Sequence, residues 1–171
     1  MSRNTPCQLT TKDVSLLECV LDRLDDRPEA DAVLARLLRH KLATARICFR
    51  DDIDPRVVTL NSRVEYRVGN GGTETRVLTL GGEVGLTDIA LPISDLRGLA
   101  LLGLMEGHSV TVETSSGKQD VIHVLRIIHQ PEAARLSRQK TEFTVITNLT
   151  AGMARPRRHE PEDDDPGPRA A

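Results

Sequence analysis

Aromatic residues are scarce in this chain of 171 residues, which has no tryptophan, one tyrosine and two phenylalanines. Proteins that bind single-stranded nucleic acid stack the bases on aromatic side chains. The scarcity therefore counts against that class, and it leaves leucine, valine, isoleucine and alanine to build the core. With 39% hydrophobic and 28% charged residues, the chain has the composition of a soluble globular protein with one domain or two small ones.

A strong excess of one charge is also missing. The formal net charge of −2 gives no general attraction to phosphate backbones, and no Lys/Arg-rich run stands out before the C-terminal tail. A basic groove could still form locally, but we expect no sequence-specific binding of nucleic acid.

Features of disulfide frameworks, metal centres and membrane proteins are absent as well. Cys7, Cys19 and Cys48 form no CxxC pair, and we interpret them as small apolar fillers. The five histidines lack zinc-ligand spacing, so we expect no metal and no cofactor. The N-terminus has no signal-peptide run, and no stretch approaches the ~20 apolar residues of a membrane span. We expect a cytoplasmic monomer with no membrane partner.

Two amphipathic helices are predicted in the first third of the chain. The first runs from Thr10 to Asp25, and Thr10 with Asp13 is a candidate cap. Its apolar residues recur at helical spacing, at Val14, Leu17, Leu21 and Leu24.

The second helix begins after a break at Asp25-Asp26-Arg27-Pro28-Glu29 and runs to about Arg46. Asp26 and Glu29 have the spacing of a capping pair, and Pro28 suits a first helical turn. The short connection predicts an antiparallel hairpin. The apolar face holds Val33, Leu34, Leu37, Leu38, Leu42 and Ala45.

After Asp54-Pro55 the pattern becomes that of strands and tight turns. It predicts strands at 57–60, 64–68, 76–80, 89–94, 110–112 and 121–128. Turns are expected at Asn70-Gly71-Gly72, through positive backbone dihedrals, and at Ser115-Ser116-Gly117. In the last strand, one face should hold Val121, His123, Leu125 and Ile127, and the other Ile122, Val124, Arg126 and Ile128.

A short helix is predicted from Asp95 to Gly103, with Gly103 as its stop. The fold class is therefore α+β: a helical hairpin followed by a small antiparallel sheet with one helix against it. We divide the chain into a flexible leader (1–9), a helical hairpin (10–48), a sheet domain (55–133) and an extension with a disordered tail (134–171). Residues 141–147 could form a strand or stay irregular, and 155–171 are too polar to fold alone.

Several short segments carry a family resemblance. Residues 57–64 (VVTLNSRV) resemble the signature that opens the C-terminal domain of Rnk proteins, regulators of nucleoside diphosphate kinase. Residues 99–103 (LALLG), followed by Gly107, resemble the ALLG…GD segment that Rnk shares with the Gre transcript-cleavage factors. Residues 114–117 match their hairpin turn, and 130–133 (QPEA) match Rnk in particular. The order and spacing of these segments cover residues 55–133.

The resemblance implies an FKBP-like sheet domain behind a coiled-coil hairpin. In Gre factors the C-terminal domain grips the rim of the RNA polymerase secondary channel, and the hairpin enters that channel. Two acidic residues at the hairpin tip help to hold a catalytic magnesium ion. This resemblance predicts a regulator that binds RNA polymerase and modulates elongation, with no catalytic residues of its own.

The tip acids of this chain are Asp25, Asp26 and Glu29. Paired carboxylates suit a shared magnesium ion, but acids also stabilise the start of a helix. Arms of about 14 and 20 residues, at ~1.5 Å per residue, reach only ~20–30 Å, which is shorter than a Gre hairpin. We therefore favour the capping role and predict no stimulation of transcript cleavage.

The predicted polymerase contact is Ser94, Asp95, Leu96, Arg97 and Gly98, because the family docks through the loop and helix start before ALLG. Asp95 and Leu96 stand where Gre factors have Ser-Pro, and His108 replaces an aspartate. Asp95 could equally be a helix N-cap.

Other positions leave alternatives open. His123 alternates with apolar residues, which favours a core or half-buried histidine over a ligand. His40, with Arg36, Arg39 and Lys41, is either a solvated face or a surface that meets acidic channel walls. An FKBP-type prolyl isomerase is a less favoured alternative, because only Tyr66 and Phe143 could line its pocket and fold does not imply function. Direct or indirect control of nucleoside diphosphate kinase is the other alternative.

Overall fold

A computed structural model describes residues 7–25, 32–81, 88–114 and 116–141. The chain falls into two compact units, Met1–Ser137 and Arg138–Ala171. Of the second unit only residues 138–141 are described, and they are helical. The predicted tail at 155–171 lies outside the described residues.

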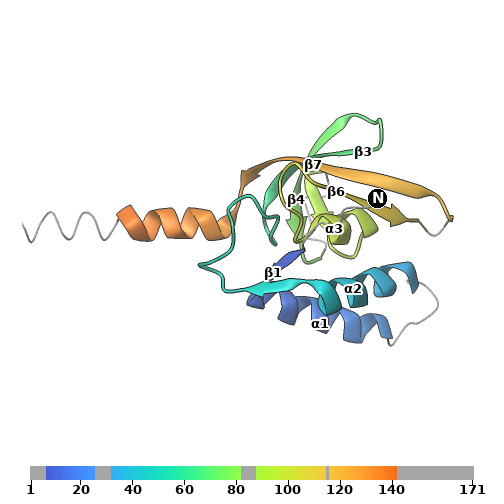
Figure 1. The fold of residues 1–171 in the computed structure, drawn as a ribbon, viewed down its shortest axis with the longest axis horizontal. Helices are drawn as coiled ribbons and strands as arrows, with labels where there is room; N and C mark the ends of the chain where they lie inside the picture. Colours follow the sequence, from blue (N-terminus) through green and yellow to red (C-terminus); the bar gives the residue numbers. More distant parts are fainter. Residues whose placement is uncertain (1–6, 26–31, 82–87, 115, 142–171) are drawn as a thin grey trace, which may run out of the picture. The chain divides into compact units, whose positions relative to one another are not determined.

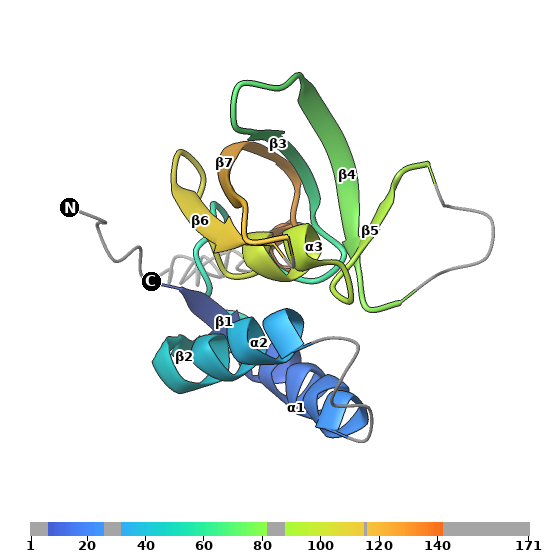
Figure 2. The same ribbon diagram turned by 90° about the vertical axis from the view of Figure 1, so that its right-hand side faces the viewer.

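The two predicted helices are confirmed as α1 (Thr11–Asp25) and α2 (Ala32–Thr44). They lie side by side and run in opposite directions (Figures 1 and 2). The predicted cap is present: the Asp13 amide donates to Thr10 Oγ1 at 3.0 Å, and the Thr10 amide donates to Asp13 Oδ2 at 3.4 Å. The pair satisfies two amides that the helix itself leaves without acceptors.

Two short strands flank the hairpin and were not predicted. β1 (Gln8–Thr10) pairs in parallel with β2 (Arg46–Cys48). Gln8 and Leu9, which we had assigned to the leader, are therefore paired, and Leu9 is fully buried. α2 ends before Arg46 because the chain there turns into β2.

The main sheet has the strand order β5-β4-β3-β7-β6 and curls around α3 (Figure 2). Its strands are β3 (Arg63–Val68), β4 (Thr73–Thr79), β5 (Ala90–Pro92), β6 (Ser109–Glu113) and β7 (Gln119–His129). The prediction of an antiparallel sheet was wrong at one edge, because β5 runs parallel to β4. Ala90 lies beside Val77 and Pro92 beside Thr79. The start of β5 is therefore displaced from the end of β4 by only about two strand residues, or ~7 Å, along the strand direction.

The predicted strand at 57–60 is also wrong. Val57 forms an isolated bridge with Met105, and the chain then turns, with Asn61 at a φ of 64°. All four residues from Val57 to Leu60 are at most 4% exposed. The mainly apolar sequence of this segment is thus explained by its burial, and the segment is not a strand of the sheet.

Two further local predictions need correction. The positive φ of the β3–β4 turn is at Gly69, one residue before the predicted Asn70-Gly71-Gly72. The alternation predicted for β7 is interrupted twice, because its pairing with β3 shifts register between Arg63 and Val64 and between Glu65 and Tyr66. Ile127 consequently lies opposite the buried Val64, and Arg126 opposite Glu65. Each β-bulge adds one residue to β7 and reverses the faces that follow.

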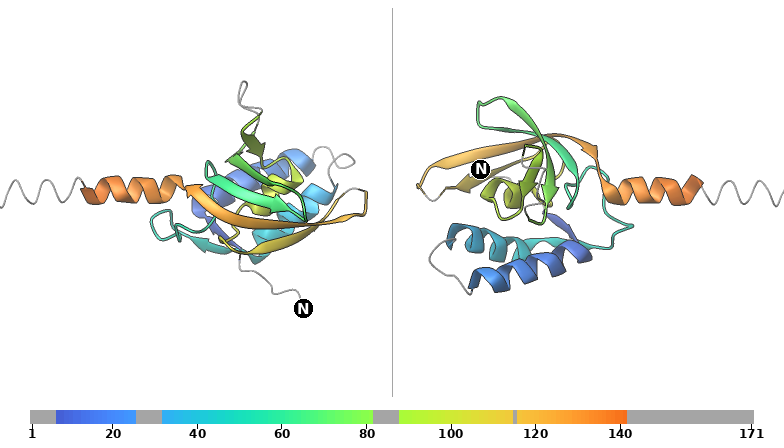
Figure 3. Two further views of the ribbon diagram at one scale, coloured as in Figure 1. Left: turned by 90° about the horizontal axis from the view of Figure 1, so that it is seen from above. Right: turned by 180° about the vertical axis from the view of Figure 1, so that it is seen from behind.

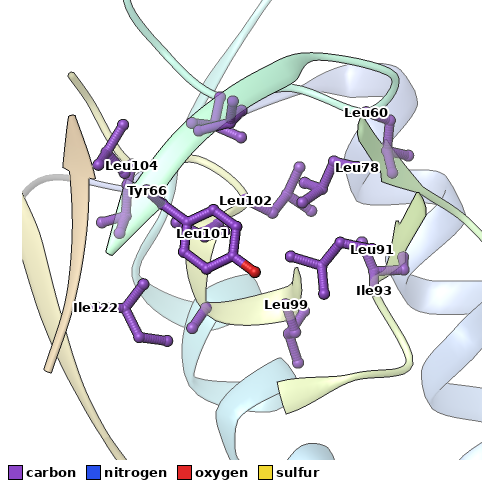
Figure 4. Packing of buried hydrophobic residues seen from close by; sticks show 14 of the residues in the cluster. Leu60, Tyr66, Leu78, Leu91, Ile93, Leu99, Leu101, Leu102, Leu104 and Ile122 are labelled. Carbon is purple, nitrogen blue, oxygen red and sulfur yellow. The ribbon is translucent and has the colours of Figure 1, made fainter. Parts of the chain in front are cut away.

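The helix α3 (Leu96–Leu101) packs into the hollow of the curled sheet. Gly103 has a φ of 80°, as its predicted role of helix stop requires. Figure 4 shows how α3 and the sheet form one core, in which the Tyr66 ring lies among leucine and isoleucine side chains. Hairpin residues Leu9, Leu17, Leu34 and Leu38 belong to the same cluster.

The tight contact of α3 with β5 gives a first prediction. A Cβ at Gly98 would collide with the Pro92 carbonyl, whereas a Cβ at Gly72 meets nothing within 4 Å. We expect Gly98→Ala to lower the free energy of unfolding by about 1–3 kcal/mol. Gly72→Ala should change it by less than about 0.5 kcal/mol. Urea denaturation of both variants checks this, and equal stabilities would contradict the close approach.

Candidate functional site

The predicted contact segment forms the start of α3. The Asp95 carboxylate accepts a hydrogen bond from the Arg97 amide at 2.7 Å, so its N-cap role is confirmed. Ser94, Asp95 and Arg97 are exposed, Leu96 is half-buried and Gly98 is buried. Three side chains of the segment can therefore meet a partner directly, while Gly98 serves the packing of α3.

Leu96 also lines a groove of about 590 Å³ between α2, α3 and β6. From α2, Arg36 forms an ion pair at 3.0 Å with Glu113 of β6, and both side chains are more than half exposed. Exposed pairs of this kind contribute little stability. The other lining residues are Val33, Leu37, His40, Thr111, Val112 and Gln119.

Arg97 lies near a polar group at the edge of the core. The Tyr66 hydroxyl donates to Glu74 Oε2 at 3.2 Å, and Arg76 Nη2 lies 3.3 Å from the same oxygen. Burial, followed by the charge of Glu74, raises the pKa of Tyr66 to about 12, while Arg76 and Arg97 act in the opposite direction. The phenol is therefore protonated at neutral pH, and its hydrogen bond to Glu74 links β3 to β4.

The cluster predicted around His40 is only partly correct, because Lys41 is buried. His40, Arg36 and Arg39 are exposed, whereas Lys41 is 5% exposed. Its Nζ donates to the carbonyls of Leu102 at 2.6 Å and Ala100 at 3.2 Å, at the C-terminal end of α3. A cation is favourable at this end of a helix. Helical spacing alone could not reveal this role, since the acceptors are main-chain atoms some 60 residues away.

Cys7 completes the surroundings of Lys41. Its Sγ lies 3.7 Å from Lys41 Nζ and 3.8 Å from the Leu102 carbonyl oxygen. Burial lowers the pKa of Lys41, and the nearby thiol partly opposes that shift. Cys7, Cys19 and Cys48 are free, and Cys19 is exposed, so the filler role fits the two half-buried cysteines and not Cys19.

Two of the segments that carry the family resemblance, 57–64 and 130–133, meet in a buried polar cluster. Thr59 Oγ1 donates to Glu132 Oε2 at 2.6 Å and lies 3.0 Å from Ser62 Oγ. Gln130 Nε2 donates to the carbonyls of Asp54 and Val57. Arg50 Nε lies 3.7 Å from Glu132 Oε1. These residues of 57–64 and 130–133 thus hold the chain before β3 against the end of β7, and their role is structural.

The remaining predicted positions are less informative. Asp25 is the last residue of α1, and Asp26 and Glu29 lie outside the described residues. His123 is half-buried, as predicted. Among the described residues, no group of three His, Cys, Asp or Glu side chains could hold a metal ion. No helix in that part of the chain is long and apolar enough to span a membrane.

Comparison with known proteins identifies the family. No family model matches the chain. The regulator of nucleoside diphosphate kinase from Escherichia coli (strain K12) is 39% identical over 109 residues, which make up 63% of this chain and 76% of the relative. The Shigella flexneri protein of that name matches to the same extent. The chain belongs to the Rnk family, the regulators of nucleoside diphosphate kinase.

The fold of this Rnk-family chain has a solved counterpart. The transcription elongation factor GreA/GreB from Nitrosomonas europaea has a TM-score of 0.56 over 72% of this chain and 99% of that one, at 24% identity. At this identity the likeness establishes the α+β fold alone. The predicted resemblance to Rnk and Gre proteins is confirmed, while the FKBP-like description and the predicted domain division stay predictions.

The Lys41 contacts predict a loss of stability when the amine is removed. Lys41→Met keeps most of the side-chain volume but leaves two buried carbonyls without their donor, which should cost about 1–3 kcal/mol. Lys12→Met, at an exposed position of α1, is the control and should cost less than about 0.5 kcal/mol. Urea denaturation measures both. A more stable Lys41→Met protein would mean that desolvation of the ammonium outweighs its hydrogen bonds.

The cap residue Asp13 predicts a pH dependence. Burial raises the pKa of its carboxyl, although the Thr10 hydrogen bonds lower it, and the charge of Glu132 adds to the rise. The folded state therefore binds the proton more tightly than the unfolded state does. The free energy of unfolding should fall as the pH rises from the unfolded pKa of about 3.8 through the raised folded value.

Asp13→Asn keeps the cap and removes this titration. We therefore compare the free energy of unfolding of the wild type with that of Asp13→Asn. The difference, wild type minus variant, should decrease as the pH rises from about 4 to about 7. Asp22→Asn, at an exposed position of α1, controls for the change in net charge. A difference that grows with pH would contradict the raised pKa.

Proposed function

We propose that the chain is a regulator that binds RNA polymerase at the secondary channel and modulates elongation without stimulating transcript cleavage. The observation that carries the proposal is the start of α3, where Ser94, Asp95 and Arg97 are exposed on a helix whose other side is fixed in the core. The Asp95 cap fixes the first turn of that helix. A partner would meet a surface that is already ordered, so binding need not order it first.

The length of the hairpin supports the absence of cleavage stimulation. α1 has 15 residues and α2 has 13, so at ~1.5 Å per residue each spans only ~20–23 Å. Carboxylates near the end of so short a hairpin would stop short of a metal deep in a channel.

Tyr66 bears on the isomerase alternative. It is the one aromatic side chain of the sheet domain within the described residues, and it is 1% exposed among core residues (Figure 4). Its ring fills the hollow of the sheet instead of lining an open pocket. The named relatives are regulators and an elongation factor, which also favours a non-enzymatic role.

Binding of core RNA polymerase to the purified chain tests the proposal. Arg97→Glu should weaken binding roughly tenfold or more, since truncating or reversing one well-placed charge commonly costs at least ~1.4 kcal/mol. Arg135→Glu, an exposed position after β7, is the charge-matched control. Asp95→Asn keeps the cap and isolates the effect of its charge.

A transcript-cleavage assay completes this test. The wild type should bind polymerase and leave backtracked transcripts intact. Robust cleavage that is lost in Asp25→Ala/Asp26→Ala would overturn the regulatory proposal in its present form, and so would an absence of polymerase binding.

Control of nucleoside diphosphate kinase is a second candidate, which the names of the relatives favour. Incubation of the chain with purified kinase, followed by a phosphotransfer assay, tests a direct effect. A changed phosphotransfer rate without any polymerase binding would favour the kinase over RNA polymerase as the partner of this chain.

A further inference from the structure

The outer face of β3 and β7 has no cover from the described residues. Val64 and Tyr66 point into the core, so Arg63, Glu65 and Arg67 point away from it. The left view of Figure 3 looks onto this face, with β3 and β7 in front and the hairpin helices behind them. We call this surface the outer β3–β7 face. It includes Arg126 and His129, which lie opposite Glu65 and Arg63.

The two register shifts of β7 place apolar side chains on this strand in contact with solvent. Between Ile122 and His129, the stretch of β7 that pairs with β3, Leu125 and Ile128 are the residues without a partner in the register. Their exposed fractions are 37% and 44%. Regular alternation would have buried Ile128 and exposed Ile127, and the bulges reverse that outcome. β-bulges commonly re-aim side chains in this manner.

The charges around these apolar residues are mainly positive. Glu65 is paired with Arg126 at 3.3 Å. Arg63 and Arg67 are exposed, and neither has an ion pair or side-chain hydrogen bond within the described part of the chain. Their Cα atoms are four strand residues apart, or ~13 Å. Two unpaired guanidinium groups therefore flank the Glu65–Arg126 pair on a chain whose net charge is −2.

We infer that the outer β3–β7 face is a second docking surface, which binds an acidic protein surface with apolar side chains at its centre, on RNA polymerase. The inference rests on the proposed function. Guanidinium groups bind carboxylates through paired hydrogen bonds, and Leu125 and Ile128 give a partner apolar area to bury. A nucleic-acid backbone would use the arginines but gain little from the two apolar side chains, and this face carries no aromatic residue for base stacking.

The outer β3–β7 face and the start of α3 belong to different elements of the fold, so the two surfaces can be altered separately. Arg63→Glu/Arg67→Glu should weaken binding of core RNA polymerase roughly tenfold or more and flatten its dependence on salt concentration. Leu125→Ser/Ile128→Ser should weaken binding without changing that salt dependence. Lys118→Glu is a charge-reversal control outside this face, because Lys118 is 77% exposed in the β6–β7 turn. Arg63→Gln/Arg67→Gln should give an intermediate loss, and circular dichroism verifies that each variant is folded.

The outcomes separate this inference from the proposed function. If the wild type binds polymerase and Arg97→Glu weakens it, while both double variants bind as tightly as Lys118→Glu, the outer face is not a docking surface and the proposed function stands. If the wild type does not bind polymerase, both fail. A DNA duplex bound by the wild type and lost in Arg63→Glu/Arg67→Glu, with polymerase binding unchanged, would assign the face to nucleic acid and overturn the inference.

Discussion

The buried amine of Lys41 is the polar contact that ties the hairpin to the end of α3. An amine is costly to bury unless acceptors surround it. Here they are two carbonyls at the end of α3 and the Cys7 thiol beside β1. One side chain of α2 therefore constrains the end of α3 and the first strand together. Because α3 begins with the exposed segment at Ser94–Arg97, the same contact fixes the hairpin relative to the proposed docking surface.

A second polar arrangement secures the opposite end of the sheet. Glu132 accepts from Thr59 and lies beside Arg50, and Gln130 holds two carbonyls of the loop before β3. Polar groups are costly to bury without partners, so the hydrogen bonds of Thr59 to Glu132 and of Gln130 Nε2 to the two carbonyls favour this arrangement of the chain. Two of the segments that resemble Rnk proteins, 57–64 and 130–133, serve this purpose. Their resemblance to Rnk proteins thus marks the scaffold, and the contact surface has to be sought elsewhere.

What the sequence could predict followed from local chemistry. The Thr10–Asp13 cap, the two helices, the Asp95 cap and the Gly103 stop all depend on neighbouring residues, and all are present. What it could not predict depends on distant partners. Nothing near Lys41 in the chain indicates that its amine meets α3, and no pattern in 119–129 shows where β7 shifts against β3. For the candidate site, the family resemblance implied the segment, but only the structure separates the exposed Arg97 from Gly98, which packing requires.

The scarcity of aromatics has a practical consequence. Tyr66 is the only tyrosine, and the chain has no tryptophan. Its absorbance at about 280 nm, where tyrosine absorbs, therefore comes from a single side chain inside the core. Its hydroxyl ionises at a pKa of about 12 in the folded protein and near 10 in an unfolded chain. Between those two values, the tyrosinate absorbance is therefore an internal, label-free signal for molecules whose core has opened.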